Sequence, residues 1–146
     1  MRTLPLTHKR ITTAILSSGL AVFAACSSMA AMSETVTLTG STEVPPVTTS
    51  ATGTADITIG ADRSVKANVT AKGMTATASH IHMGAAGIDG PVIVPFTKSG
   101  DNTFSAAPDA KLTEEQYAAY KAGKLYVNVH SEKNKGGEIR GQLKGS

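Results

Sequence analysis

The chain has 146 residues, 40% of them hydrophobic, and its 14 basic and 11 acidic residues give a formal net charge of +3. A basic balance is typical of nucleic-acid-binding proteins, but here the excess comes from Arg2, Lys9 and Arg10. Without those three, the remaining 11 basic residues equal the 11 acidic ones, so the charge gives no support to a nucleic-acid partner. The length fits one domain, and the apolar content is sufficient for a core built mainly of Val, Ile, Leu and Ala.

The N-terminal segment has the pattern of an export signal. The positively charged residues 1–10 precede an uncharged, largely apolar run over 11–25. That run is too short to span a bilayer as a helix, which takes about 20 residues. We therefore predict a signal peptide over 1–25, a tether over 26–33 and one domain over 34–146. The protein is expected in the periplasm or anchored by a lipid to the cell envelope.

Cys26, the one cysteine of the chain, directly follows the apolar run. Residues 23–26 (FAAC) resemble a bacterial lipobox, in which the cysteine becomes the lipidated first residue, although Phe23 stands where Leu is usual. The alternative is cleavage after Ala30 by an ordinary signal peptidase, with Cys26 part of the discarded signal. A lipid on Cys26 is the membrane contact we expect. A single cysteine excludes an internal disulfide.

The rest of the chain alternates apolar and polar residues in short segments separated by Gly and Pro. In 52–59, for example, Ala55, Ile57 and Ile59 alternate with Thr and Asp, which is the period-two pattern of a half-buried strand. The pattern predicts strands over 34–40, 52–59, 64–71, 78–83, 92–96, 125–130 and 138–143. Short strands at this spacing indicate an antiparallel sandwich or barrel.

One helix is predicted over 113–122, among these strands. Thr113 is a suitable N-cap, and Gln116 three residues later completes the pattern of a capping box. Gly123 supplies the signal that ends the helix. We expect this helix to be a structural connector without a role in chemistry.

Three histidines lie within the predicted strands. His80 and His82 flank Ile81, and residues two apart in a strand point the same way. Both imidazoles are therefore expected on one face, with Ile81 pointing into the core. His130 ends the segment 125–130, in which alternate residues are Leu, Val and Val, so it is also expected on the polar side of its strand.

Imidazole in its neutral form is a good ligand for copper and zinc, and a His-x-His pair on a strand offers two ligands at once. A third histidine from another strand would complete a trigonal set with an open position. We predict a metal site formed by His80, His82 and His130. Copper is preferred over zinc because of the Irving–Williams order. The alternative is that these histidines are solvated residues on an exposed face.

Neighbouring residues are weaker candidates. Met83 is expected to face the core, and Met74 to fill a gap in a loop rather than bind copper. Asp89 lies in a glycine-rich loop and is predicted to be a turn residue. No Lys-Ser/Thr pair directly follows those glycines and no helix begins there, so the sequence favours a turn-rich loop over a phosphate-binding loop. No nucleophile motif accompanies the histidines, so we expect no enzyme.

Three blocks of the sequence resemble the CHRD (chordin-type) domain family: 43–47 (EVPPV), 79–91 (SHIHMGAAGIDGP) and 125–143 (LYVNVHSEKNKGGEIRGQL). The resemblance extends over 34–146 and identifies the chain as a bacterial exported member. It implies an all-β, antiparallel fold, namely an immunoglobulin-like Greek-key sandwich similar to that of copper–zinc superoxide dismutase, with one short helix near 113–122.

The likeness to a dismutase also bears on function. A dismutase carries a His-x-His strand and a late histidine, which His80, His82 and His130 match. Three histidines cannot fill two metal sites, and one cysteine cannot form the dismutase disulfide, so we expect at most the copper-like half of that centre. The sequence predicts an exported protein that holds copper for storage, delivery or tolerance. The alternative is a metal-free structural or protein-interaction domain of the cell envelope.

Overall fold

The structure, a computed structural model, describes residues 30–145. The predicted signal peptide and Cys26 lie outside the described residues. Within the described range, no helix combines the length and the hydropathy that a membrane span needs.

The described chain forms strands joined by short loops, with one α-helix. In chain order the elements are β1 (Met32–Thr39), a 3-10 turn (Gly40–Thr42), β2 (Thr52–Ile59), β3 (Val65–Lys72), β4 (Ala76–Met83), β5 (Val92–Gly100), β6 (Thr103–Ala106), α1 (Glu114–Lys121), β7 (Leu125–Ser131) and β8 (Ile139–Gln142). Each strand except β6 overlaps a predicted one. β1 begins at Met32, inside the range predicted as a tether.

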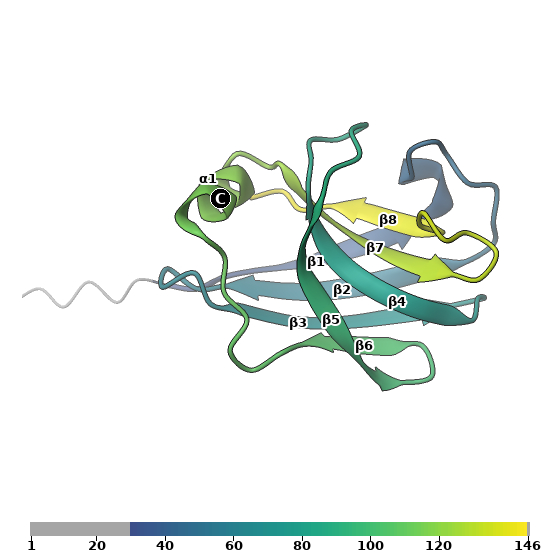
Figure 1. The fold of residues 1–146 in the computed structure, drawn as a ribbon, viewed down its shortest axis with the longest axis horizontal. Helices are drawn as coiled ribbons and strands as arrows, with labels where there is room; N and C mark the ends of the chain where they lie inside the picture. Colours follow the sequence, from purple (N-terminus) through teal and green to yellow (C-terminus); the bar gives the residue numbers. More distant parts are fainter. Residues whose placement is uncertain (1–29, 146) are drawn as a thin grey trace, which may run out of the picture.

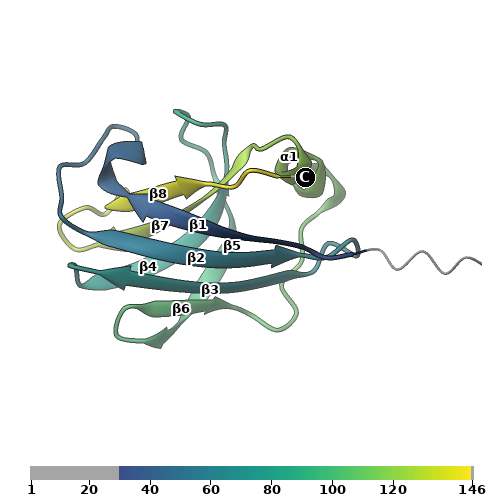
Figure 2. The same cartoon turned by 180° about the vertical axis from the view of Figure 1, so that it is seen from behind.

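The strands are antiparallel and close into a barrel in the order β1-β2-β3-β6-β5-β4-β7-β8. Figure 1 shows β4 and β5 in front, and Figure 2, which views the molecule from behind, shows β1, β2 and β3 side by side in front. The all-β antiparallel class with one short helix is thus confirmed. The order β7-β4-β5-β6 is that of a Greek key, but the expected two-sheet sandwich is not confirmed. β6, which was not predicted, pairs with both β3 and β5 and closes the sheet into a barrel.

The core lies inside the barrel and follows the period-two alternation. Ile81 and Val127 face each other in register on β4 and β7, and both are fully buried. Gly141 of β8 lies so close to β1 that a Cβ there would be 2.5 Å from a methyl group of Val36. This strand therefore requires glycine at that position because it crosses β1 at short range.

The helix α1 lies at one end of the barrel, and the 3-10 turn lies at the opposite end (Figure 1). The predicted capping box is present: Gln116 N donates to Thr113 Oγ1 (3.2 Å), and Thr113 N donates to Gln116 Oε1 (2.9 Å). Tyr120 is 1% exposed, which fixes the helix against the barrel. The role expected for this segment, a structural connector, agrees with that packing.

Candidate metal centre

The three predicted ligands lie together on the outer face of the barrel, where β4 pairs with β7. In this antiparallel pair, His82 lies opposite Tyr126, His80 opposite Asn128, and Ala78 opposite His130. His130 is therefore a diagonal neighbour of His80, a relation that brings long side chains within reach. The register alone thus positions the cluster, because all of these residues occupy the face opposite the core.

The ring nitrogens are close enough for one metal ion to organise them. Nδ1 of His80 lies 3.0 Å from Nε2 of His130. One nitrogen from each of His80, His82 and His130 can be chosen so that all lie within 4.8 Å of one another. Three ligands at about 2.0 Å from a metal ion in a plane lie about 3.5 Å apart. The widest pair therefore has to close by ring movements of less than an ångström each.

Backbone carbonyls fix the tautomers of two of these rings. Nδ1 of His82 lies 2.9 Å from Gly90 O, and Nδ1 of His130 lies 2.8 Å from Lys135 O. A carbonyl oxygen only accepts hydrogen bonds, so both Nδ1 atoms carry the proton. In the neutral rings, both Nε2 atoms are then unprotonated, and that of His130 lies 3.0 Å from Nδ1 of His80. Nε2 of His82 is buried and has no hydrogen-bond partner among residues 30–145. A hydrogen bond from the non-coordinating ring N–H group to a carbonyl oxygen is typical of metal-binding histidines.

The environment favours neutral rings. Burial, together with the nearby His130 and His82, lowers the pKa of His80 from 6.5 to about 4. Burial also lowers the pKa of His82, against the opposing effect of its hydrogen bond to Gly90. Because a metal ion binds the neutral imidazole, these two side chains are in the ligand form at neutral pH.

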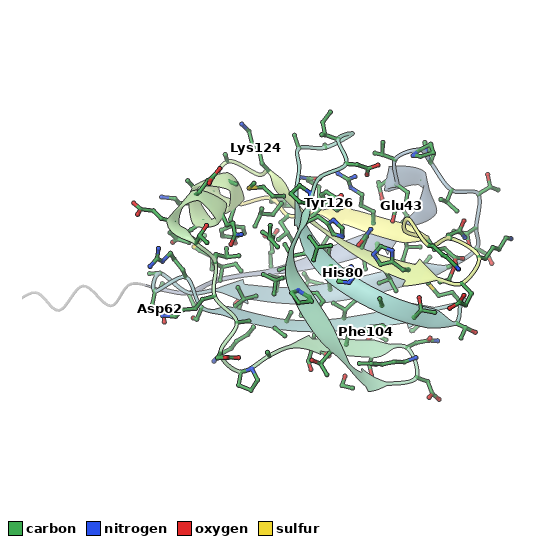
Figure 3. The ribbon with its side chains drawn as sticks, in the orientation of Figure 1. Glu43, Asp62, His80, Phe104, Lys124 and Tyr126 are labelled. Atoms are coloured by element: carbon green, nitrogen blue, oxygen red, sulfur yellow. The ribbon has the colours of Figure 1, made fainter. Side chains whose placement is uncertain are left out.

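The face that carries the histidines is covered rather than exposed. His82 is 8% exposed, and Tyr126 and Asn128 beside it are 2% exposed. The alternative of a solvated face is therefore wrong for His82. Figure 3 shows His80, Tyr126 and Glu43 on the same side of the molecule, over β4, β7 and β8, with Asp62 near the far end.

Arg140 is a central residue of this face that the sequence analysis missed. It is 1% exposed, and its guanidinium carbon lies 3.3 Å from the centre of the Tyr126 ring. The other side of that ring stacks on His82, with ring centres 4.8 Å apart and planes 11° apart. Arg140 also binds the loop 84–90, including Asp89 at 3.3 Å. Asp89, expected to be only a turn residue, is thus an ion-pair partner. A single arginine on an otherwise uncharged strand was the available signal.

Glu43 is a second buried residue that the sequence analysis did not single out. It is 4% exposed, and its Oε1 has no partner among the described residues. Burial raises its pKa from 4.5 to about 7, although the Arg140 charge acts in the opposite direction. It lies against Gly137, where a Cβ would collide with the Glu43 carboxyl group and lie 2.8 Å from Asn128 Nδ2. The segment containing Glu43 therefore packs closely on the loop before β8.

The two methionines considered as ligands pack against the core. Met83 and Met74 are both partly buried and contact the hydrophobic cluster inside the barrel, as the sequence analysis expected. The metal-ligating candidates brought together by the structure are thus the three predicted histidines.

An antiparallel barrel with a cluster of three histidines on its outer face is the class of domain that these observations define. The CHRD domain family matches residues 35–143, and the chain belongs to this family. No curated protein matches the chain. No solved structure matches it either, so the expected likeness to a dismutase stays a prediction.

Proposed function

We propose that this protein is an exported CHRD domain that binds one transition-metal ion through Nδ1 of His80 and Nε2 of His82 and His130. The observation that carries the proposal is the hydrogen bonding of the rings: two carbonyls hold protons on the Nδ1 atoms of His82 and His130, which leaves both Nε2 atoms unprotonated, each with a lone pair that can bind a metal ion. The pairing of β4 with β7 supports the proposal, because the register of these strands brings the three rings together.

Copper is the favoured metal. Three imidazoles form an uncharged set of nitrogen ligands, and copper exceeds zinc in affinity for such sites by the Irving–Williams order. We infer storage, delivery or tolerance of copper rather than catalysis. In support, the Nδ1 atoms of His82 and His130 contact backbone carbonyls, which orient rings but transfer no protons.

Export is the second part of the proposal. The charged residues 1–10 and the apolar run 11–25 support a signal peptide, and the position of Cys26 supports a lipid anchor in the cell envelope. A Cys26→Ser variant tests the anchor: it is expected to leave the membrane fraction and appear in the periplasm. An unchanged membrane fraction for this variant contradicts lipidation.

Titration of the purified protein with Cu(I), Cu(II) and Zn(II) tests metal binding. The wild type is expected to bind one equivalent of copper more tightly than zinc. The triple variant His80→Ala, His82→Ala, His130→Ala is expected to lose that equivalent. Asn68→Ala serves as the control, since Asn68 is an exposed residue of β3. Equal copper affinity of the wild type and the triple variant rejects the site.

The alternative is a metal-free interaction domain of the cell envelope. Its structural support is the exposure of two large apolar residues in or next to the loop 84–90: Ile88 is 57% exposed and Val92 is 48% exposed. This alternative replaces the first proposal if the wild type binds none of the three ions.

A further inference from the structure

The tautomer of His82 depends on the position of one carbonyl group. Gly90 O accepts the proton on His82 Nδ1 at 2.9 Å, and Gly90 N donates to the hydroxyl group of Tyr126 at 3.1 Å. Gly90 lies outside β4 and β5. It packs so tightly that a Cβ there would overlap the carbonyl group of Met83. The contact to His82 is therefore made by a loop residue, and whatever holds this loop also holds the ring.

Arg140 binds the loop 84–90 through its guanidinium group. Its Nη2 donates to the carbonyl oxygens of Ala85 (3.1 Å) and Ile88 (2.8 Å), and its Nη1 donates to Asp89 (3.3 Å). Although the arginine is 1% exposed, the loop it binds is at the surface, with Ile88 57% exposed. One buried guanidinium group thus binds this surface loop at three places.

Arg140 also fixes Tyr126, which is the second partner of Gly90. The guanidinium group lies on one face of the Tyr126 ring, and His82 stacks on the other. A cation on an aromatic face is attracted by the ring quadrupole, and this attraction is strongest where water is excluded. The order of the layers is therefore Arg140, Tyr126, His82, with Gly90 bound to both of the aromatic residues.

We infer that Arg140 is a positioning residue for His82. Through the 84–90 loop and the Tyr126 ring, it keeps the Gly90 carbonyl group on Nδ1 of His82. The Nε2 lone pair of His82 therefore stays directed toward the cluster before any metal arrives. The consequence for metal affinity rests on the proposed function, but the effect on the ring does not, because the contacts are those of the metal-free protein.

Long-range ¹H–¹⁵N spectra of the metal-free protein at neutral pH report which nitrogen of each histidine carries the proton. In the wild type, His82 and His130 are both expected to carry it on Nδ1. In Arg140→Lys, which keeps the charge but loses the planar fork, His82 is expected to become a mixture of tautomers. Tyr126→Phe, which removes the acceptor of the Gly90 N–H group, is expected to act in the same direction.

His130 is the internal control, because its Nδ1 donates to Lys135 O and not to the 84–90 loop. It is expected to keep its tautomer in both variants, whereas a general loss of structure changes both rings. Tyr120→Phe is the matched control for the loss of a buried phenol, since Tyr120 is 1% exposed and belongs to α1. It is expected to change neither ring.

A His82 ring that keeps a single tautomer in folded Arg140→Lys overturns the inference. If that variant does not fold, Tyr126→Phe decides by the same criterion. For copper, Arg140→Lys is expected to bind about 10- to 100-fold more weakly than the wild type, which is the usual effect of losing a contact behind a ligand. A wild type that binds no metal refutes the proposed function alone, because the tautomer result is obtained without metal.

Discussion

His80 and His130 are 50 residues apart in the sequence, yet Nδ1 of the first lies 3.0 Å from Nε2 of the second. Since the Nδ1–H group of His130 donates a hydrogen bond to Lys135 O, its Nε2 is an acceptor in the neutral ring. The short contact in the neutral, metal-free cluster is therefore a hydrogen bond donated by His80. It occupies the two nitrogen atoms through which these rings are proposed to bind a metal ion.

Metal binding is expected to switch the tautomer of His80. The proton has to leave Nδ1 and appear on Nε2, whereas His82 and His130 already present Nε2 and keep their tautomers. Long-range ¹H–¹⁵N spectra before and after addition of one equivalent of Cu(I), which is diamagnetic, measure this directly. A His80 ring that keeps its proton on Nδ1 in the copper-loaded protein contradicts coordination through that atom.

The stability of the metal-free protein is expected to fall on acidification, partly through His80. Its pKa is about 4 in the folded protein and 6.5 without these surroundings, so the unfolded chain binds more protons between these values. The His80 contribution is therefore complete above about pH 6.5 and is lost as the pH falls toward 4. Urea unfolding at pH 7 and pH 4.5 is expected to show a smaller loss for His80→Gln than for the wild type. An equal loss refutes the assignment.

Glu43 is expected to act in the opposite direction. Its pKa is raised to about 7 from 4.5, so between these values the folded protein binds more protons than the unfolded chain. Its contribution is complete below pH 4.5 and is lost as the pH rises through 7. In Glu43→Gln, which stays neutral, the loss of unfolding free energy between pH 5 and pH 8 is expected to be smaller than in the wild type. The same pH dependence in both proteins would falsify this.

Glu138→Gln is the matched control for that experiment. Glu138 is also buried, but its carboxylate accepts hydrogen bonds from Ser131 and from Thr49 (2.7 Å). Burial raises the pKa of Glu138, but these bonds outweigh it and the pKa is lowered. Removing this charge is therefore expected to destabilise the protein at neutral pH, in contrast to the change at Glu43.

Gly137→Ala is expected to destabilise the fold by about 1–3 kcal/mol. Gly137 has φ +134°, a conformation that side chains with a Cβ rarely adopt, and its Cβ would collide with the Glu43 carboxyl group. Gly136→Ala is the control, because a Cβ there meets nothing within 4 Å. Urea unfolding of the two variants measures the difference. Equal stabilities contradict the close packing of Glu43 on this loop.

Ile81→Ala tests how the ligand strand is anchored. Ile81 lies between the two β4 ligands and is fully buried inside the barrel. Its truncation is expected to cost about 2–5 kcal/mol, and Ile81→Val about 0.5–1.5 kcal/mol. Copper affinity of folded Ile81→Val is expected to stay within a few-fold of the wild type, because the ligands lie on the other face. Chemical unfolding and copper titration of both variants provide the measurements.

The strand pattern predicted the histidine cluster because alternation specifies which face each residue occupies. It placed Ile81 inside and His80 and His82 outside, and the register of β4 on β7 agrees. It also predicted seven of the strands, but not β6, since the four residues Thr103–Ala106 are too short for a clear period. Without β6, closure of the sheet into a barrel could not be inferred.

Alternation cannot indicate whether an outer face is covered. Tyr126, for example, is buried and its hydroxyl group accepts a hydrogen bond from Gly90, in a loop that is distant in sequence. Arg140 is 52 residues from Ile88, whose carbonyl oxygen it binds. Contacts of this kind produce no periodic pattern in the sequence. The role of Arg140 and of the loop 84–90 was therefore found only in the structure.

The ligands and the hydrophobic core leave β4 on opposite faces of the same strand. Changes at the histidines therefore do not alter packing inside the barrel, and changes inside the barrel do not remove a ligand. Changes at the histidines instead affect the loops that cover them. Under the proposed function, local substitutions on one wall of the barrel are enough to gain, lose or exchange a metal, and protein engineers can use the same wall as a replaceable module.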